Sequence, residues 1–232
     1  MTQRMDRARV EAAVRELLAG IGEDPDRPGL ERTPQRVADA YTEFFHGLDL
    51  DATRIAREGT VPAGDGERGD LVVVRDILFR SVCEHHLLPF LGTAHLAYAP
   101  GERLIGLGTL ARVVEALASR PQLQERLGEQ VVAAVQDGLE ARGVLVVLDA
   151  QHQCVTTRGE RQTSSTTVTV AASGVLAEAA GRAEAITLIG AGASTGAAAG
   201  ASTGAAAGAD TTSAAGGSDA TVGGGRDHGT DA

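Results

Sequence analysis

The stretch that decides the fold is "DLVVVRDILFRSVCEHHLLPFLGTAHLAYAP", from Asp70 to Pro100. Both ends of this stretch are rich in β-branched and other apolar residues, which favour strands. Pro100 and Gly101 end the second run. Between the two runs lies "CEHH", a cluster of side chains able to bind a metal or to move a proton. The stretch therefore predicts two strands joined by a chemically active segment.

The rest of the chain predicts an α+β domain with helices at its N-terminus. Apolar side chains at helical spacing predict a helix over residues 6–21, and "RTPQRVADAYTEFFHGL" predicts a second one with Thr33 as its N-cap. "LARVVEALASR" and "QLQERLGEQVVAAVQDGLEARG" predict two more helices, the last with Gly143 as its C′ residue. "VLVVLDAQHQC" and "TSSTTVTVAA" predict two further strands. The order α, α, ββααββ predicts an antiparallel four-stranded sheet with two helices on one face.

The composition changes along the chain and suggests four regions. We expect an N-terminal helical region over residues 1–50, a polar, Gly-rich loop over 51–70 and the α+β domain over 71–189. Beyond that, "GASTGAAA" occurs twice in tandem, and Ala, Gly, Ser and Thr dominate to the last residue. Such a segment has too little large apolar surface to offset its ordering entropy, so 190–232 is predicted to be a disordered tail.

Charge and cysteine content narrow the class of protein. The 232 residues carry a formal net charge of −10, which makes the chain a poor non-specific partner for nucleic acid or for an anionic membrane. No apolar run approaches the roughly 20 residues of a membrane span, and the N-terminus has no secretory h-region. Two cysteines without a signal peptide favour a reducing compartment, so we expect a cytoplasmic protein.

The few cysteines and histidines suggest a metal site. Cys83 and His86 have the Cys-x-x-His spacing of one arm of a zinc site, and Cys154 follows in "DAQHQCVTTRG". Three ligands leave one tetrahedral position open, as in catalytic rather than structural sites. His85 and His152 are then free for proton transfer near neutral pH. On spacing alone, each cysteine could equally be a small buried apolar residue.

Longer motifs resemble a known family. "SVCEHHLLPFLGTAHLAYAP", "IGLGTLARVVEALASRPQLQERL" and "DAQHQCVTTRGERQTSSTTVT" resemble GTP cyclohydrolase I, with a likeness running from about Thr33 to about Leu176. The resemblance implies a zinc-dependent enzyme that converts GTP to 7,8-dihydroneopterin triphosphate and formate. It also implies the tunnelling fold, in which the sheets of several subunits close into a barrel, and a homo-oligomer that is typically a decamer of two stacked pentamers.

The same resemblance assigns roles to individual residues. The positions matching the zinc ligands are Cys83, His86 and Cys154; those matching the catalytic histidines are His85 and His152; those matching guanine recognition are Gln124 and Glu125; and those matching the triphosphate contacts are Arg36, Arg112 and Arg158. Zinc would activate water for attack at C8 of the purine, while His152 donates a proton to N7. The Glu125 carboxylate would accept from N1–H and the 2-amino group, a pair of donors that adenine lacks.

The chain departs from the family where the phosphates should bind. Gly108 and Thr109, in "GLGTLAR", stand where the family usually has Ser and Lys, and Asp39 stands where it usually has a lysine. The loss of positive charge predicts weaker triphosphate binding. Two alternatives to a GTP cyclohydrolase I therefore remain at this point. One is a paralogue acting on a guanine compound with fewer phosphates, and the other is a non-catalytic, zinc-stabilised oligomer.

Overall fold

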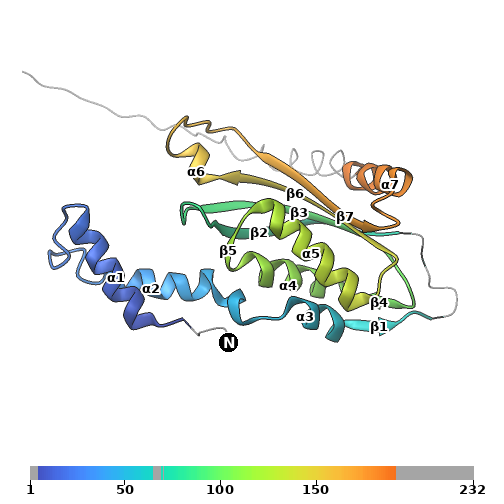
Figure 1. Cartoon of the computed structure of the whole chain (residues 1–232), viewed down its shortest axis with the longest axis horizontal. Coiled ribbons are helices and arrows are strands. Elements are labelled where there is room, and N and C mark those ends of the chain that lie inside the picture. Colours follow the sequence, from blue (N-terminus) through green and yellow to red (C-terminus); the bar gives the residue numbers. More distant parts are fainter. Residues whose placement is uncertain (1–4, 65–68, 70, 192–232) are drawn as a thin grey trace, which may run out of the picture.

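The computed structural model describes residues 5–64, 69 and 71–191 (Figure 1). Its N-terminal part is helical, with α1 over Arg7–Gly20, α2 over Thr33–Phe44, the 3-10 helix η1 over His46–Asp49 and α3 over Ala52–Glu58. Helices α1 and α2 form a hairpin that extends away from the sheet (Figure 1). None of the residues of α1 is fully buried: Val10, Val14 and Leu18 are half-buried, and Leu17 is exposed.

Both N-terminal helices are as predicted, but the start of α2 differs by one residue. Arg32 is the N-cap residue and Thr33 is the first helical residue, with Pro34 in the first turn. The prediction of Thr33 as the N-cap is therefore wrong. Proline is favoured in the first helical turn because its missing N–H needs no partner there. Helix α1 begins with a side-chain cap, in which Asp6 accepts from the Arg9 N–H at 3.1 Å.

The prediction of a loop over 51–70 is also wrong, because residues 52–62 form a helix and a strand. Its first part forms α3, capped by Asp51, which accepts from the Arg54 N–H at 3.0 Å. Strand β1, over Thr60–Pro62, follows and pairs with β4, over Arg103–Ile105. Because α3 is short and buries only small alanine side chains against its neighbours, it leaves little apolar periodicity in the sequence.

The predicted antiparallel four-stranded sheet is present. Its long strands are β2 over Val72–Cys83, β3 over Pro89–Ala99, β6 over Gly143–His152 and β7 over Thr167–Gly174. A fifth strand, β5, spans only Pro121–Gln122 and pairs in parallel with the end of β2, which gives the order β5-β2-β3-β6-β7. The sheet is therefore mixed rather than purely antiparallel.

Helices cover both faces of the sheet, not one. The two predicted helices, α4 over Leu107–Ala118 and α5 over Gln124–Leu139, bury their apolar sides against one face and form the main core. A helix that the sequence did not suggest, α7 over Ala179–Gly190, packs against the other face through a small cluster that includes Ala185 (Figure 1). Its alanine-rich sequence has no clear apolar stripe, which is the signal that predicts a helix.

The end of α5 differs from the prediction of Gly143 as its C′ residue. Glu140 ends the helix in the left-handed conformation with φ 56°, and Gly143 is the first residue of β6. A glycine is needed there for a different reason. A Cβ atom on Gly143 would lie 2.8 Å from the backbone N of Leu176, so the segment that follows β7 could not approach so closely.

The predicted disordered tail over 190–232 lies almost entirely beyond the described residues. Gly190 is the last residue of α7, and residues 192–232 of the expected disordered tail lie outside the described residues. Among the residues that are described, no helix combines the length and the apolar character needed to cross a membrane.

Candidate metal centre

Two separate segments bring the three predicted metal ligands together. Cys83 ends β2, and the turn that follows places Nδ1 of His86 4.0 Å from Sγ of Cys83. Cys154 lies in α6, a short helix over Gln153–Thr156 that starts directly after β6. The antiparallel register of β3 and β6 pairs Phe90 with His152, which brings the two segments side by side. The ligand atoms of Cys83, His86 and Cys154 all lie within 4.8 Å of one another.

The chemistry of this group suits zinc. Two thiolates and an imidazole are donors that Zn²⁺ favours, and a tetrahedral site with ordinary zinc bond lengths separates its ligand atoms by about 3.5–4 Å. The observed separations need only small shifts, which the exposed His86 side chain can make. Burial raises the pKa of the Cys154 thiol, and the neighbouring Cys83 raises it further. A divalent cation between the two sulfurs would remove this penalty by favouring both thiolates.

His152 lies beside the three ligands and is held in place by two contacts. Its ring stacks on Phe90 with a centroid distance of 4.6 Å and an interplanar angle of 6°. Its Nε2 atom lies 2.7 Å from Oε1 of Gln124. Burial lowers the pKa of His152, and the Glu125 carboxylate opposes this to a smaller extent by raising it.

The hydrogen bonds of Gln124 define which ring nitrogen of His152 carries a proton. Gln124 is 1% exposed, and its Nε2 donates to the carbonyl oxygens of Leu148 at 3.0 Å and Thr167 at 2.8 Å. Because these two partners can only accept, the amide orientation is fixed and Oε1 must be the acceptor toward His152. The Nε2–H of His152 is therefore the donor in this bond. Both ends of the Gln124 side chain are engaged within the chain.

These side chains line a common cavity of about 450 Å³. Its lining comprises Cys83, His85, His86, Gln122, Leu123, Gln124, Glu125, His152, Cys154, Val155 and Thr167. It thus contains the three predicted metal ligands, both predicted catalytic histidines and both residues predicted to recognise guanine. A neighbouring hollow of about 670 Å³, between α5 and β7, shares Glu125 with it and contains none of the predicted ligands.

The three predicted triphosphate arginines are not brought into this cavity. Arg36 on α2, Arg112 on α4 and Arg158 after α6 are all exposed, and none of them belongs to the cavity lining formed by the described residues. Arg158 is the one near the centre, since its charge lowers the pKa of Cys154. The single chain therefore brings together the residues predicted to bind metal and guanine, but not the three predicted arginines.

The residues that depart from the family pattern have structural partners of their own. Asp39 forms an ion pair with Arg7 of α1. Thr109 is only 8% exposed, and its side chain faces Gly59 so closely that a Cβ atom there would lie 2.3 Å from its Oγ1. Gly108, in contrast, has open space around it. The Thr109 hydroxyl is thus directed into the α3–α4 contact rather than toward the cavity.

Several residues of the site were missed from the sequence. Phe90, which stacks on His152, and Gln122, Leu123 and Thr167, which line the cavity, were not singled out. Gln122 could have been noticed, because it is a polar residue in the short connection between two apolar helices, two positions before the predicted site residue Gln124. Phe90 and Thr167 gave no local signal, since only the pairing of the strands brings them to the site.

Comparisons with known proteins agree with this centre. The family model described as GTP cyclohydrolase I matches residues 10–190. The chain is 61% identical over 189 residues to GTP cyclohydrolase 1 of Leifsonia xyli, covering 82% of this chain and 98% of that protein. It is 50% identical over 189 residues to GTP cyclohydrolase 1 of Carboxydothermus hydrogenoformans, covering 80% and 96%.

A solved structure gives a much weaker likeness. The apo archaeosine synthase QueF-Like superposes with a TM-score of 0.39 at 18% identity, covering 46% of this chain and 95% of that chain. This value is too low to bear on fold or activity. The family match over most of the chain, with the metal ligands converging in one cavity, leads to a plain conclusion: the chain belongs to the GTP cyclohydrolase I family.

Proposed function

We propose that this chain is a zinc-dependent GTP cyclohydrolase I, which hydrolyses the imidazole ring of the guanine base of GTP at C8 to give 7,8-dihydroneopterin triphosphate and formate. One observation carries the proposal: Cys83, His86 and Cys154 converge in the cavity that also contains two further histidines and a carboxylate. The relatives named GTP cyclohydrolase 1, at 50–61% identity over most of their length, support the same activity.

Cys83, His86 and Cys154 would hold the metal as two thiolates and one imidazole, leaving one coordination position for water or substrate. Zinc bound there supplies the Lewis acidity that makes water a nucleophile near neutral pH. The chain's own groups then orient the base and move the protons. Because metal and proton-transfer groups would act on the same base, the ligands and the proton-carrying side chains need to share one cavity.

His152 is the proposed proton donor to N7, the step that makes C8 electrophilic. Phe90 fixes its ring plane and Gln124 holds its Nε2–H, so the proton passed to N7 would leave from Nδ1 of the doubly protonated ring. His85 is exposed at the mouth of the cavity and is assigned to the later ring opening and loss of formate. A side chain that must serve an intermediate as it rearranges is better placed on the exposed rim of the cavity than in the core.

Glu125 is the proposed guanine-recognition residue. It lines the cavity as an exposed residue in the first turn of α5, where the positive end of the helix favours a carboxylate. Two donors of the guanine edge, N1–H and the 2-amino group, match its two oxygens. Gln124 was expected to share this role, which stays a prediction. Its hydrogen bonds within the chain support a further role for it in orienting His152.

The triphosphate contacts stay a prediction for Arg36, Arg112 and Arg158, as does the homo-oligomer of two pentamers whose sheets close into a barrel. Arg36 and Arg112 are not among the described residues that line the cavity of their own chain, which supports an arrangement in which a neighbouring copy supplies such cations. The cytoplasmic location also stays a prediction.

The proposal is tested by incubating the zinc-loaded protein with GTP while pterin absorbance and formate are followed together. Both products should rise in equal amounts. Formate without pterin would mean that the ring opens but does not rearrange. No product from the zinc-loaded protein would contradict the proposal, and GDP, GMP and guanosine would then be compared.

A further inference from the structure

The metal-ligand turn, residues 84–88 between β2 and β3, is exposed and strained. Cys83 is buried, but His85, His86 and Leu87 are exposed. Leu87 has a φ of 52°, a left-handed conformation that costs a bulky residue free energy. Such a conformation persists only where the surrounding structure enforces it. Two backbone hydrogen bonds close the turn, from the Leu87 N–H to Cys83 O and from the Cys83 N–H to Leu88 O, both at 2.9 Å. Where the closed turn lies, with the ligand His86, depends on contacts from outside it.

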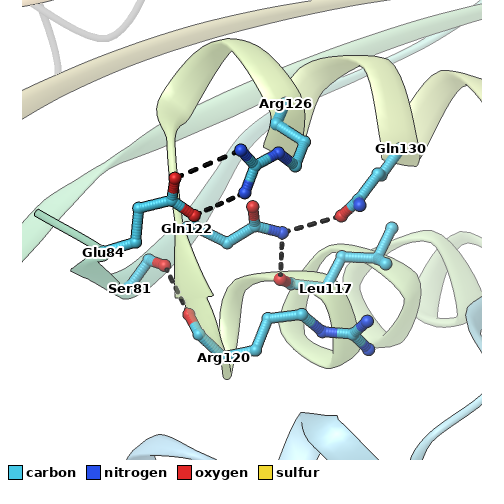
Figure 2. A network of polar contacts seen from close by, with 7 residues as sticks. All are labelled: Ser81, Glu84, Leu117, Arg120, Gln122, Arg126 and Gln130. Atoms are coloured by element: carbon cyan, nitrogen blue, oxygen red, sulfur yellow. Dashed lines mark hydrogen bonds and ion pairs between the residues drawn. The ribbon is translucent and has the colours of Figure 1, made fainter.

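Glu84 makes those contacts. Its backbone N–H donates to the carbonyl oxygen of Gln122 at 3.0 Å, next to the short parallel pairing of β2 with β5. Its carboxylate accepts two hydrogen bonds from the Arg126 guanidinium, Nη1 to Oε2 at 2.5 Å and Nη2 to Oε1 at 3.2 Å (Figure 2). Two parallel charge-assisted bonds fix an orientation as well as a distance.

The other end of this contact lies on the guanine side of the site. Arg126 belongs to the first turn of α5, which also carries Gln124 and Glu125. The connection before that turn is itself anchored, because the Gln122 Nε2 donates to Leu117 O at 3.0 Å and to Gln130 Oε1 at 2.7 Å (Figure 2). The end of β2 is fixed to the end of α4 and to the same connection, since Ser81 Oγ donates to Ala118 O at 2.7 Å and lies 3.4 Å from Arg120 O (Figure 2).

Neither member of the pair lines the cavity, so neither is placed to touch metal or base. We propose that the ion pair between Glu84 and Arg126 is a brace that couples zinc affinity to guanine binding, because it ties the metal-ligand turn to the first turn of α5. Glu84 and Arg126 are thus positioning residues. The zinc half of this inference stands on the metal ligands alone, and the guanine half rests on the proposed function.

The exposure of the ion pair limits how much its loss can change zinc affinity. The Arg126 side chain is 45% exposed and the Glu84 side chain 29%, and half-exposed ion pairs are weak. We therefore expect Glu84→Gln and Arg126→Gln each to raise the zinc Kd by about three- to fivefold. The double variant should bind zinc no more weakly than the weaker-binding single variant, because both changes break the same contact.

The experiment uses the full chain and measures zinc Kd by competition with a chromogenic chelator, together with KM and kcat for GTP. In the single variants the KM for GTP should rise by a larger factor than kcat falls. Arg126→Lys keeps the charge, so it should recover part of the lost zinc affinity and part of the rise in KM. Arg54→Gln is the matched control, since it breaks the Arg54–Glu58 ion pair on α3, away from the site. It should change neither zinc Kd nor KM.

Three results would overturn the brace. The zinc Kd of both single variants could equal that of the parent chain, with or without a lower thermal midpoint, which would leave the pair as a fold contact only. The losses of the two variants could add in the double variant. Arg54→Gln could weaken zinc as much as they do. Because zinc Kd needs no turnover, a chain inactive on GTP still tests the zinc half, which separates this inference from the proposed function.

Discussion

At the scale of single residues, the surroundings of His152 set what the site can do. A face-on contact with Phe90 and a hydrogen bond to Gln124 leave the ring little freedom, so its reactive edge has a fixed direction. Fixing a proton donor in advance removes reorganisation from the reaction step. Burial lowers the pKa of the ring, which favours its giving up a proton once it has acquired one.

His152→Ala should lower kcat by at least about 100-fold, because a positioned general acid is lost. Zinc content should stay unchanged, since His152 is not one of the three converging ligands. Steady-state kinetics and metal analysis on the same preparation check both points. His95→Gln, which changes a histidine of β3 outside the cavity lining, is the control and should retain activity. A His152→Ala variant with near-normal turnover would refute the donor role.

Glu125→Gln should act mainly on substrate binding. It replaces an acceptor for two guanine donors by an amide with one acceptor and one donor group, so KM for GTP should rise by about 10- to 100-fold. Glu129→Gln, one turn further along α5 in the neighbouring hollow, should leave KM near its original value. Equal effects of the two substitutions would show that only the overall negative charge of this helix matters.

The sequence identifies part of this site and not the rest, for a physical reason. Cys83 and His86 are found by their spacing, because both lie in one turn. The role of Gln124 depends on Leu148 and Thr167, which reach it only through the pairing of β6 and β7. The contact of Thr109 with Gly59 likewise joins distant segments. The sequence therefore shows that a threonine replaces the family's usual lysine, but not that this threonine packs against Gly59.

At the scale of elements, length and periodicity decide what could be predicted. The long helices α4 and α5 and the four long strands carry clear apolar patterns and are present. The pieces that were missed are short or rich in small residues: α3 buries alanines, β5 has two residues, and α7 has no apolar stripe. Tertiary contacts stabilise these pieces, and those contacts are not visible in a local pattern.

Two helical glycines separate the effect of local helix propensity from the effect of tertiary packing. Gly108, in α4, has nothing within 4 Å of an added Cβ atom, so Gly108→Ala should stabilise the protein by about 0.5–1 kcal/mol. In α5, an added Cβ atom on Gly138 would lie 2.5 Å from Cβ of Ala56, so Gly138→Ala should destabilise by about 1–3 kcal/mol. Denaturant unfolding of the zinc-loaded variants measures both. Shifts of the same sign would contradict the close α3–α5 packing.

At the scale of the whole molecule, the single chain leaves large apolar side chains in solvent. Leu17 of α1 and Ile21, which caps the end of α1, are 62% and 68% exposed, and Leu78 of β2 is 80% exposed. Exposed apolar surface of this kind is typical of contacts between subunits. It agrees with a cavity that lacks the predicted phosphate-binding arginines in one chain, since a second copy could both cover the surface and complete the site.

Light scattering coupled to gel filtration tests the predicted assembly. The result expected is a particle of ten copies of the 23.7 kDa chain. Leu17→Glu and Ile21→Glu together should shift it toward smaller species, because charge would replace the open apolar face of α1, whereas Arg54→Gln should not. A monomer at all concentrations would contradict the decamer and the idea that a neighbour supplies cations.

The central claim, hydrolysis at C8 of guanine by the Cys83–His86–Cys154 centre, is tested most directly with GTP carrying carbon-13 at C8. We predict that the zinc-loaded protein releases all of the label as formate, in a one-to-one ratio with 7,8-dihydroneopterin triphosphate, and that Cys154→Ser releases none. Label retained in the purine, while zinc is bound and the fold is intact, would contradict the account.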